Sequence, residues 1–149
     1  MPVLFQKFIK REDLIRNRGV VYIFGDNIMR RGMGGQAAEM RNEPNALGIA
    51  TKRSPEHDEI DYFDESPEGI VAQKAIIDQD FKKAFEHVKA GGILIWPTDG
   101  IGTGISELPK RAPTTMTYIE DKLTALIRVG RLFDKGDVKG AFEMAKEHI

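Results

Sequence analysis

The stretch Gly25-Asp26-Asn27-Ile28-Met29-Arg30-Arg31-Gly32-Met33-Gly34-Gly35-Gln36 decides how this chain folds. It follows residues 20–24, an apolar and β-branched run typical of a buried strand, and it precedes helix-like residues 37–41. In α/β proteins this order of strand, glycine-rich loop and helix start presents backbone N–H groups to a phosphate. Glycine is needed in such loops because the backbone must touch the ligand without an intervening Cβ.

A second loop of the same kind follows residues 93–97, another strand-like run that ends in proline. It reads Asp99-Gly100-Ile101-Gly102-Thr103-Gly104-Ile105-Ser106. Two such loops in one small domain predict a diphosphate held between them. No lysine follows in the register of a Walker A loop, so the pattern does not indicate a triphosphate site. Flexible strand-to-helix turns are the alternative explanation of the glycines.

Composition limits the class of protein. The chain has 149 residues, of which 41% are hydrophobic, and residues 1–149 are expected to form one domain. A net charge of -1 argues against a general nucleic-acid binder, and the absence of cysteine excludes disulfides and cysteine-based sites. No apolar run approaches the roughly 20 residues of a membrane span. We therefore expect a cytoplasmic protein without a membrane partner.

Strand and helix patterns alternate along the chain, which predicts an α/β fold with helices on both faces of the sheet. Residues 10–13 are read as a charged break, and residues 52–68 as a polar, acidic loop or lid. The expected strands are residues 3–9, 20–24, 46–51 and 93–96, and the expected helices are residues 35–41, 70–89, 113–129 and 138–148.

The two glycine loops and their spacing resemble the macrodomain family, whose members bind ADP-ribose. Macrodomains carry an asparagine after the second strand and begin a glycine run five positions later, as Asn27 and Gly32 do here. Their second loop follows a strand ending in proline, which Pro97 matches. The resemblance covers about residues 12–126. It implies a three-layer α/β/α sandwich built around a mixed sheet.

The resemblance also implies roles for individual residues. Asp13 lies about fourteen positions before Asn27, where the family's aspartate binds the adenine amino group. A surface or helix-capping aspartate is the alternative for Asp13. Asn27 would bind the distal ribose, with Asp26 beside it as a further ligand contact, a base or a turn residue. The loops would hold the diphosphate through the remaining ligand-binding residues, which are Gly32, Gly34, Gly35, Gly102, Thr103, Gly104, Ile105 and Ser106.

Residues 48–55, with the sequence GIATKRSP, narrow the resemblance to one branch. They are similar to the Thr-Lys element of terminal ADP-ribose protein glycohydrolase and of the antitoxins that remove ADP-ribose from DNA. In that branch the lysine attacks or stabilises the C1″ centre, and Lys52 matches it. Asn27 and Glu107 complete the catalytic candidates, with Glu107 as a general acid or base. An exposed lysine at a strand end is the alternative for Lys52.

The chain departs from the family pattern at several positions. The usual Asn-Ala-Ala-Asn is replaced by residues 24–27, Phe-Gly-Asp-Asn. The aspartate that follows the glycines in the commonest macrodomain hydrolases is absent, and Gln36 stands there. Ser106 and Glu107 occupy the region where the glycohydrolase has an aspartate. These changes affect the predicted catalysis more than the predicted binding.

Three functions stay open on this basis. The first is hydrolytic release of ADP-ribose from a modified protein side chain or DNA base. The second is a non-catalytic reader or sequestering protein for ADP-ribose or another NAD-derived nucleotide. The third is an interaction module in which the glycine loops are structural. We expect a monomer without a cofactor or a metal site, and we interpret the acidic segment around His57 as a solvated loop.

Overall fold

The computed structural model describes residues 2–149, so Met1, the first residue of the predicted domain, lies outside the described residues. A four-stranded sheet with the order β1-β4-β2-β3 forms the centre of the molecule. Along the chain the elements are β1 (Val3–Gln6), α1 (Arg11–Arg16), β2 (Val21–Asn27), α2 (Ala37–Met40), β3 (Ala46–Lys52), the 3-10 helix η1 (Glu59–Asp61), α3 (Pro67–Lys89), β4 (Leu94–Pro97), α4 (Leu108–Arg111), α5 (Pro113–Asp134) and α6 (Val138–Lys146).

The strands of the sheet all run parallel, so the expected mixed sheet is wrong. The cause is that α1, α2 and α3 each connect one strand to the next, and a crossover over the sheet face returns the chain in the same direction. Within residues 2–149, antiparallel pairing is limited to an isolated bridge between Lys52 and Tyr62. The continuous apolar run in β2 is the pattern of a strand that is buried on both faces.

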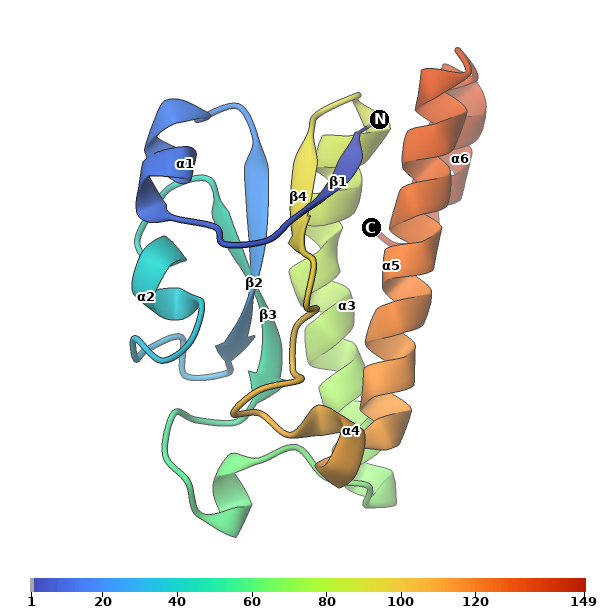
Figure 1. Cartoon of the computed structure of the whole chain (residues 1–149). Helices are drawn as coiled ribbons and strands as arrows, with labels where there is room; N and C mark the ends of the chain where they lie inside the picture. The colour runs from blue at the N-terminus through green and yellow to red at the C-terminus, as the bar shows by residue number, and fades with distance from the viewer. Residues whose placement is uncertain (1) are drawn as a thin grey trace.

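Helices cover both faces of the sheet, as the alternation of side chains in β2 requires. Tyr22 and Phe24 pack with Leu14 of α1 and Met40 of α2 in a small cluster. Ile23 points the other way, into the larger core with α3, α5 and α6. Figure 1 shows this arrangement, with α1 and α2 on one side of the strands and α3 and α5 on the other. The α/β prediction with helices on both faces is therefore confirmed.

Several element boundaries differ from the expected ones for local reasons. The charged break at residues 10–13 is instead the start of α1, where the Asp13 carboxylate accepts the Lys10 backbone N–H at 2.9 Å. Helix α3 begins three residues early because Pro67 takes its first position and Ser66 caps Gly69 N–H at 3.0 Å. Helix α2 is a single turn. Within residues 2–149, no helix is long and apolar enough to cross a lipid bilayer.

Candidate functional site

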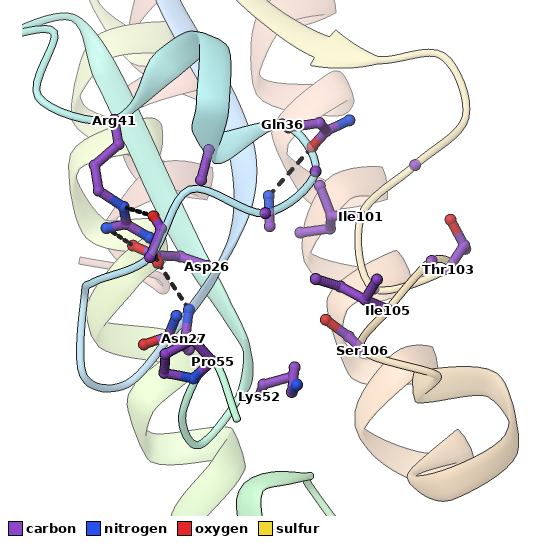
Figure 2. Close-up of a pocket in the computed structure, with 18 of the residues that line it drawn as sticks. Asp26, Asn27, Gln36, Arg41, Lys52, Pro55, Ile101, Thr103, Ile105 and Ser106 are labelled. Carbon is purple, nitrogen blue, oxygen red and sulfur yellow. Dashed lines mark hydrogen bonds and ion pairs between the residues drawn. The ribbon is translucent and has the colours of Figure 1, made fainter. Parts of the chain in front are cut away.

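A cavity of about 530 Å³ opens where strands β2, β3 and β4 end. The loop after β2, residues 28–36 (the first loop), forms one wall, and the loop after β4, residues 98–107 (the second loop), forms the other. Figure 2 shows Asp26, Asn27 and Lys52 across the cavity from Ile101, Ile105 and Ser106. The lining residues are Gly25, Asp26, Asn27, Arg31, Gly32, Gly34, Gly35, Gln36, Ala37, Arg41, Lys52, Pro55, His57 and residues 99–106.

Sheet topology explains why the cavity lies at this place. Strands β2 and β4 are neighbours, but the chain leaves β2 towards α2 on one face and leaves β4 towards α4 and α5 on the other. The two loops therefore diverge, and a crevice opens between them at the carboxyl ends of the strands. Such a switch point is the usual ligand site of parallel α/β sheets.

Close packing fixes the two walls relative to each other. A Cβ on Gly34 would lie 3.2 Å from Ile105 Cδ1, so the first loop touches the second at this point. Gly32 has a φ of +97°, and a Cβ there would lie 3.1 Å from Pro55 Cβ. The glycines thus allow a sharp turn in the first loop and its close approach to its neighbours.

The second loop is tied to the end of the sheet through hydroxyl groups. Thr51 Oγ1 and Ser106 Oγ are 2.7 Å apart and buried, and Thr51 Oγ1 also donates to the carbonyl of Asp26 at 3.1 Å. Ile101, which is 2% exposed, anchors the middle of the loop in the core. The predicted ligand contact Ser106 therefore also holds the wall in place.

Both walls carry runs of backbone N–H groups without internal acceptors. The backbone N–H groups of residues 32–36 in the first loop and of residues 101–106 in the second donate no hydrogen bond to any acceptor among residues 2–149. Apart from Met33, the residues that carry these amides line one cavity. Successive N–H groups of this kind form an anion-binding surface.

Asn27 is buried at the wall of the cavity, with 7% of its surface exposed. Its Nδ2 donates to the carbonyl oxygen of Arg31 at 2.7 Å. Its Oδ1 is also buried and has no hydrogen-bond partner among the described residues. A buried acceptor without a partner costs free energy, and a hydrogen-bond donor on a ligand would remove that cost.

Asp26, the neighbouring candidate, is held in a chain of charged side chains. Its carboxylate pairs with Arg41, whose Nη1 lies 3.4 Å from Oδ2, and with Arg30, whose Nη1 lies 3.6 Å from Oδ2. Arg30 continues to Asp80 of α3 at 2.6 Å, and Asp80 accepts the Ala50 backbone N–H at 2.8 Å. Burial raises the pKa of the Asp80 carboxyl. Asp26 is therefore an ion-paired carboxylate rather than an exposed turn residue.

Lys52 lies in the cavity wall and is 3% exposed, so it is not the exposed strand-end lysine of the alternative interpretation. Its Nζ donates to the carbonyl of Glu56 at 2.7 Å and lies 4.3 Å from the centroid of the Tyr62 ring. Burial lowers the pKa of the Lys52 amine, although the carboxylates of Asp61 and Glu56 act in the opposite direction. A lowered pKa makes an amine a better nucleophile near neutral pH.

Two predicted site residues are not part of the cavity wall. Asp13 lies in α1, and its carboxylate accepts from Gln6 Nε2 at 3.0 Å as well as from the Lys10 N–H. Glu107 lies 3.2 Å from Arg111 Nε and has a left-handed φ of 50°. The structure brings the other predicted residues to one cavity, but it does not bring these two.

The cavity also contains side chains that the sequence did not single out as ligand contacts. Gln36 Oε1 accepts the Gly25 N–H at 3.3 Å, Arg41 contacts Asp26, and His57 Nδ1 lies 3.3 Å from the Tyr62 hydroxyl. Gln36 directly follows the glycine run, and Arg41 is one of several arginines in the sequence around the first loop; these were the available signals. His57 gave none, because it reaches the cavity through the folding of residues 53–62.

The acidic segment around His57 does not form a metal site in the part of the chain that the structure describes. There, no group of three or more His, Cys, Asp or Glu side chains is placed to hold a metal ion. Instead, the segment makes ion pairs and hydrogen bonds: Arg31 contacts Glu56 at 2.5 Å, and Arg53 contacts Asp64 at 2.9 Å. These bonds shape the rim of the cavity beside Lys52.

No curated protein matches the chain, and no solved structure matches it. Residues 4–122, which include both loops, the cavity and Lys52, match a protein family described as being of unknown function, DUF7831. Because this match spans most of the sequence, the chain belongs to that family.

Proposed function

We propose that this protein binds ADP-ribose in the cavity between the two loops and releases it hydrolytically from a modified protein side chain or DNA base. The fold would then be a variant of the macrodomain three-layer sandwich with a parallel sheet. The observation that carries the proposal is the pair of N–H runs without acceptors, residues 32–36 and 101–106, on opposite walls of one cavity. Such walls suit a diphosphate, which can accept hydrogen bonds from both sides.

The dimensions and polarity of the cavity support a nucleotide-sized ligand. Its volume of about 530 Å³ lies within the usual range for small-molecule sites. Arg31 and Arg41 line it but are already bound to Glu56 and Asp26 respectively. The anion would therefore be held mainly by backbone donors, as the glycine loops suggest.

Asn27 supports a sugar beside the diphosphate. Its Oδ1 lacks a donor among residues 2–149, and a ribose hydroxyl is a donor of suitable size. A small adjustment of the wall must accompany that contact because Oδ1 is buried. The distal ribose of ADP-ribose would then lie between Asn27 and Lys52.

Lys52 supports hydrolysis at C1″ of that ribose. In the overall reaction the oxygen of water bonds to C1″, the bond from C1″ to the modified atom breaks, and the departing atom takes the proton. A buried amine with a lowered pKa can attack C1″ transiently, or in its charged form stabilise the leaving group. Asp13 and Glu107 lie outside the cavity wall, so the proposal does not depend on them.

Calorimetric titration with ADP-ribose, with AMP and NAD as comparisons, tests the binding. We expect saturable binding that is selective for ADP-ribose because AMP lacks the second phosphate and the distal ribose. Absence of binding at millimolar ADP-ribose would refute the proposal. Turnover is then measured as release of ADP-ribose from modified protein and from modified DNA, comparing the wild type with Lys52→Ala. Loss of release with retained binding supports the catalytic role of Lys52.

A non-catalytic reader is the second candidate, and one observation favours it. Glu107, at the end of the second loop, is paired with Arg111 outside the cavity wall, and Asp26 is paired with two arginines. Among the described residues that line the cavity, this leaves Asp99 as the carboxylate without an ion pair. The site therefore has few carboxylates free to move a proton. A reader predicts that the wild type binds ADP-ribose and releases none from either substrate.

A further inference from the structure

The guanidinium of Arg41 binds two backbone carbonyl groups of the first loop. Its Nε donates to the carbonyl of Gly32 at 2.7 Å, and its Nη2 lies 3.4 Å from the carbonyl of Arg31. The same guanidinium binds both carboxylate oxygens of Asp26. Figure 2 shows Arg41 on the side of Asp26 that is remote from Ile101 and Ser106. One side chain thus joins the end of β2 to two consecutive peptide groups of the first loop.

These two bonds determine where the neighbouring N–H groups point. In a planar trans peptide the C=O and the following N–H point in opposite directions. With the carbonyls of Arg31 and Gly32 turned towards the guanidinium, the N–H groups of Gly32 and Met33 must point away from it. Those N–H groups begin the run that has no acceptor among residues 2–149.

The same carbonyl orients the amide of Asn27. The Arg31 oxygen accepts from Asn27 Nδ2 at 2.7 Å as well as from Arg41. If the Asn27 amide flipped, its oxygen would face that carbonyl and repel it. The position of the Arg31 carbonyl, which Arg41 helps to hold, therefore fixes the orientation of the Asn27 amide. In this orientation Nδ2 is bonded and Oδ1 is the atom without a partner.

Asp26 is a rigid anchor for the guanidinium. Its side chain is 4% exposed, and its Oδ1 accepts the Asn27 backbone N–H at 2.8 Å. It lies over Gly48, where a Cβ would be 2.5 Å from Oδ2, so the missing side chain at Gly48 leaves it room. The Arg41 side chain is 11% exposed and lies 5.5 Å from the centroid of the Phe24 ring. Little of the guanidinium remains free to bind a ligand directly.

We propose that Arg41 is a positioning residue that, anchored by Asp26, holds the first loop with its N–H groups and Asn27 Oδ1 free for a ligand. This inference rests on the proposed ADP-ribose site for its functional consequence. The planar fork of arginine is required because a single group must satisfy two carbonyls and a carboxylate together. A lysine keeps the charge beside Asp26 but cannot make all of these bonds.

The test compares Arg41→Gln and Arg41→Lys with Arg30→Gln. Arg30 pairs with the same carboxylate but binds neither the Arg31 nor the Gly32 carbonyl, so it is a matched control. NMR order parameters of the amides of residues 32–36 report the loop directly. We expect values of about 0.85 in the wild type and below about 0.6 in both Arg41 variants, with residues 101–106 unchanged. Arg30→Gln should leave the first loop rigid.

Calorimetry with ADP-ribose gives the functional measurement on the same variants. We expect dissociation constants at least about tenfold weaker for Arg41→Gln and Arg41→Lys, because a mobile loop must be ordered on binding, and a change of less than about threefold for Arg30→Gln. Wild-type-like binding and a rigid loop in Arg41→Lys would overturn the inference. If Arg41→Gln fails to fold, the measurements on Arg41→Lys alone test the positioning role.

The two proposals can fail separately. If the wild type does not bind ADP-ribose while the Arg41 variants still mobilise residues 32–36, the proposed function is refuted and the positioning role remains. If the loop stays rigid in both Arg41 variants, the positioning role is refuted whether or not ADP-ribose binds. If both loops become equally mobile, Arg41 supports the fold in general and the inference is likewise refuted.

Discussion

At the scale of single residues, Lys52 lies in an environment unlike that of an ordinary surface lysine. It is 3% exposed, and its Nζ is bound by the Glu56 carbonyl and lies against the Tyr62 ring. The fold therefore disfavours the charged amine relative to the unfolded chain, in which the amine is hydrated. That difference links the protonation of Lys52 to stability.

We predict that Lys52 makes the stability of the protein rise with pH on the alkaline side. The folded pKa is lowered, so between that pKa and the ordinary value of 10.5 the unfolded chain binds more protons than the folded one. The free energy of unfolding of the wild type should therefore increase, relative to Lys52→Met, as pH rises through this window. Urea unfolding at several pH values between neutrality and pH ~10 measures it.

An exposed lysine supplies the control for this measurement. The Lys139 side chain is 88% exposed, so Lys139→Met should track the wild type at each pH. If the curves of the wild type and Lys52→Met run parallel across the alkaline range, the amine is not desolvated and the argument for its reactivity is lost.

At the scale of elements, the second loop depends on one backbone conformation. Gly102 has a φ of +77°, and its carbonyl accepts the Leu108 N–H at 2.9 Å. A Cβ on Gly102 would overlap the side chain of Leu108, which is fully buried and cannot move aside. This loop therefore needs glycine at position 102 for its path and not merely for flexibility.

We predict that Gly102→Ala lowers the free energy of unfolding by about 1–3 kcal/mol because it adds backbone strain and a steric overlap. Gly104→Ala is the matched control, since a Cβ there meets nothing within 4 Å, and it should change stability by less than about 0.5 kcal/mol. Chemical denaturation of both variants measures the difference. Equal losses in the two variants would contradict the structure.

Local patterns were enough to predict some elements and not others. The apolar run at residues 20–24 and the helical spacing at residues 70–89 identify β2 and α3 because each pattern reports burial within its own segment. Helix α1 was missed because it is short and mostly charged, although the alternative of a helix-capping role for Asp13 is confirmed. Strand direction depends on how helices cross the sheet, so the mixed sheet predicted from the family resemblance was wrong.

The candidate site was predictable to the extent that its residues directly follow strands. Asn27 and Lys52 end β2 and β3, and the second loop follows β4, so the order of neighbouring parallel strands brings them together. Sequence spacing could not show that Glu107 faces Arg111 or that Asp13 is held by Gln6, because both depend on contacts between elements. The bonds of Arg41 to Asp26 and to the carbonyls of the first loop are likewise visible only in three dimensions.

At the scale of the whole molecule, His148 near the end of the chain packs on helices α3 and α5, which cover the sheet face opposite α1 and α2. The His148 ring stacks on Phe85 of α3 with centroids 4.3 Å apart, and its Nδ1 lies 3.0 Å from Lys122 Nζ of α5. Lys122 also pairs with Asp78 at 3.0 Å. Burial, and then the nearby Lys122 ammonium, lower the pKa of the His148 imidazole, while Glu147 and Asp78 act in the opposite direction.

We predict that His148 makes the fold less stable in mild acid. Its folded pKa lies below the ordinary value of 6.5, so its contribution is fully present above pH 6.5 and is lost as the pH falls through the folded pKa. His148→Phe keeps an aromatic ring against Phe85 and removes the titration. Urea unfolding at pH ~7.5 and pH ~5.5 should show a smaller loss for this variant than for the wild type; an equal loss would contradict the prediction.

The series of ion pairs that links Arg41, Asp26, Arg30 and Asp80 also reaches the edge of the sheet. Strand β3 is an outer strand, and its outward-facing Ala50 N–H and Gly48 carbonyl are taken by Asp80 and Arg30. An outer strand with unpaired backbone groups can recruit a strand from another molecule and so start aggregation. By occupying those groups, Asp80 and Arg30 leave fewer of them for a strand of another molecule.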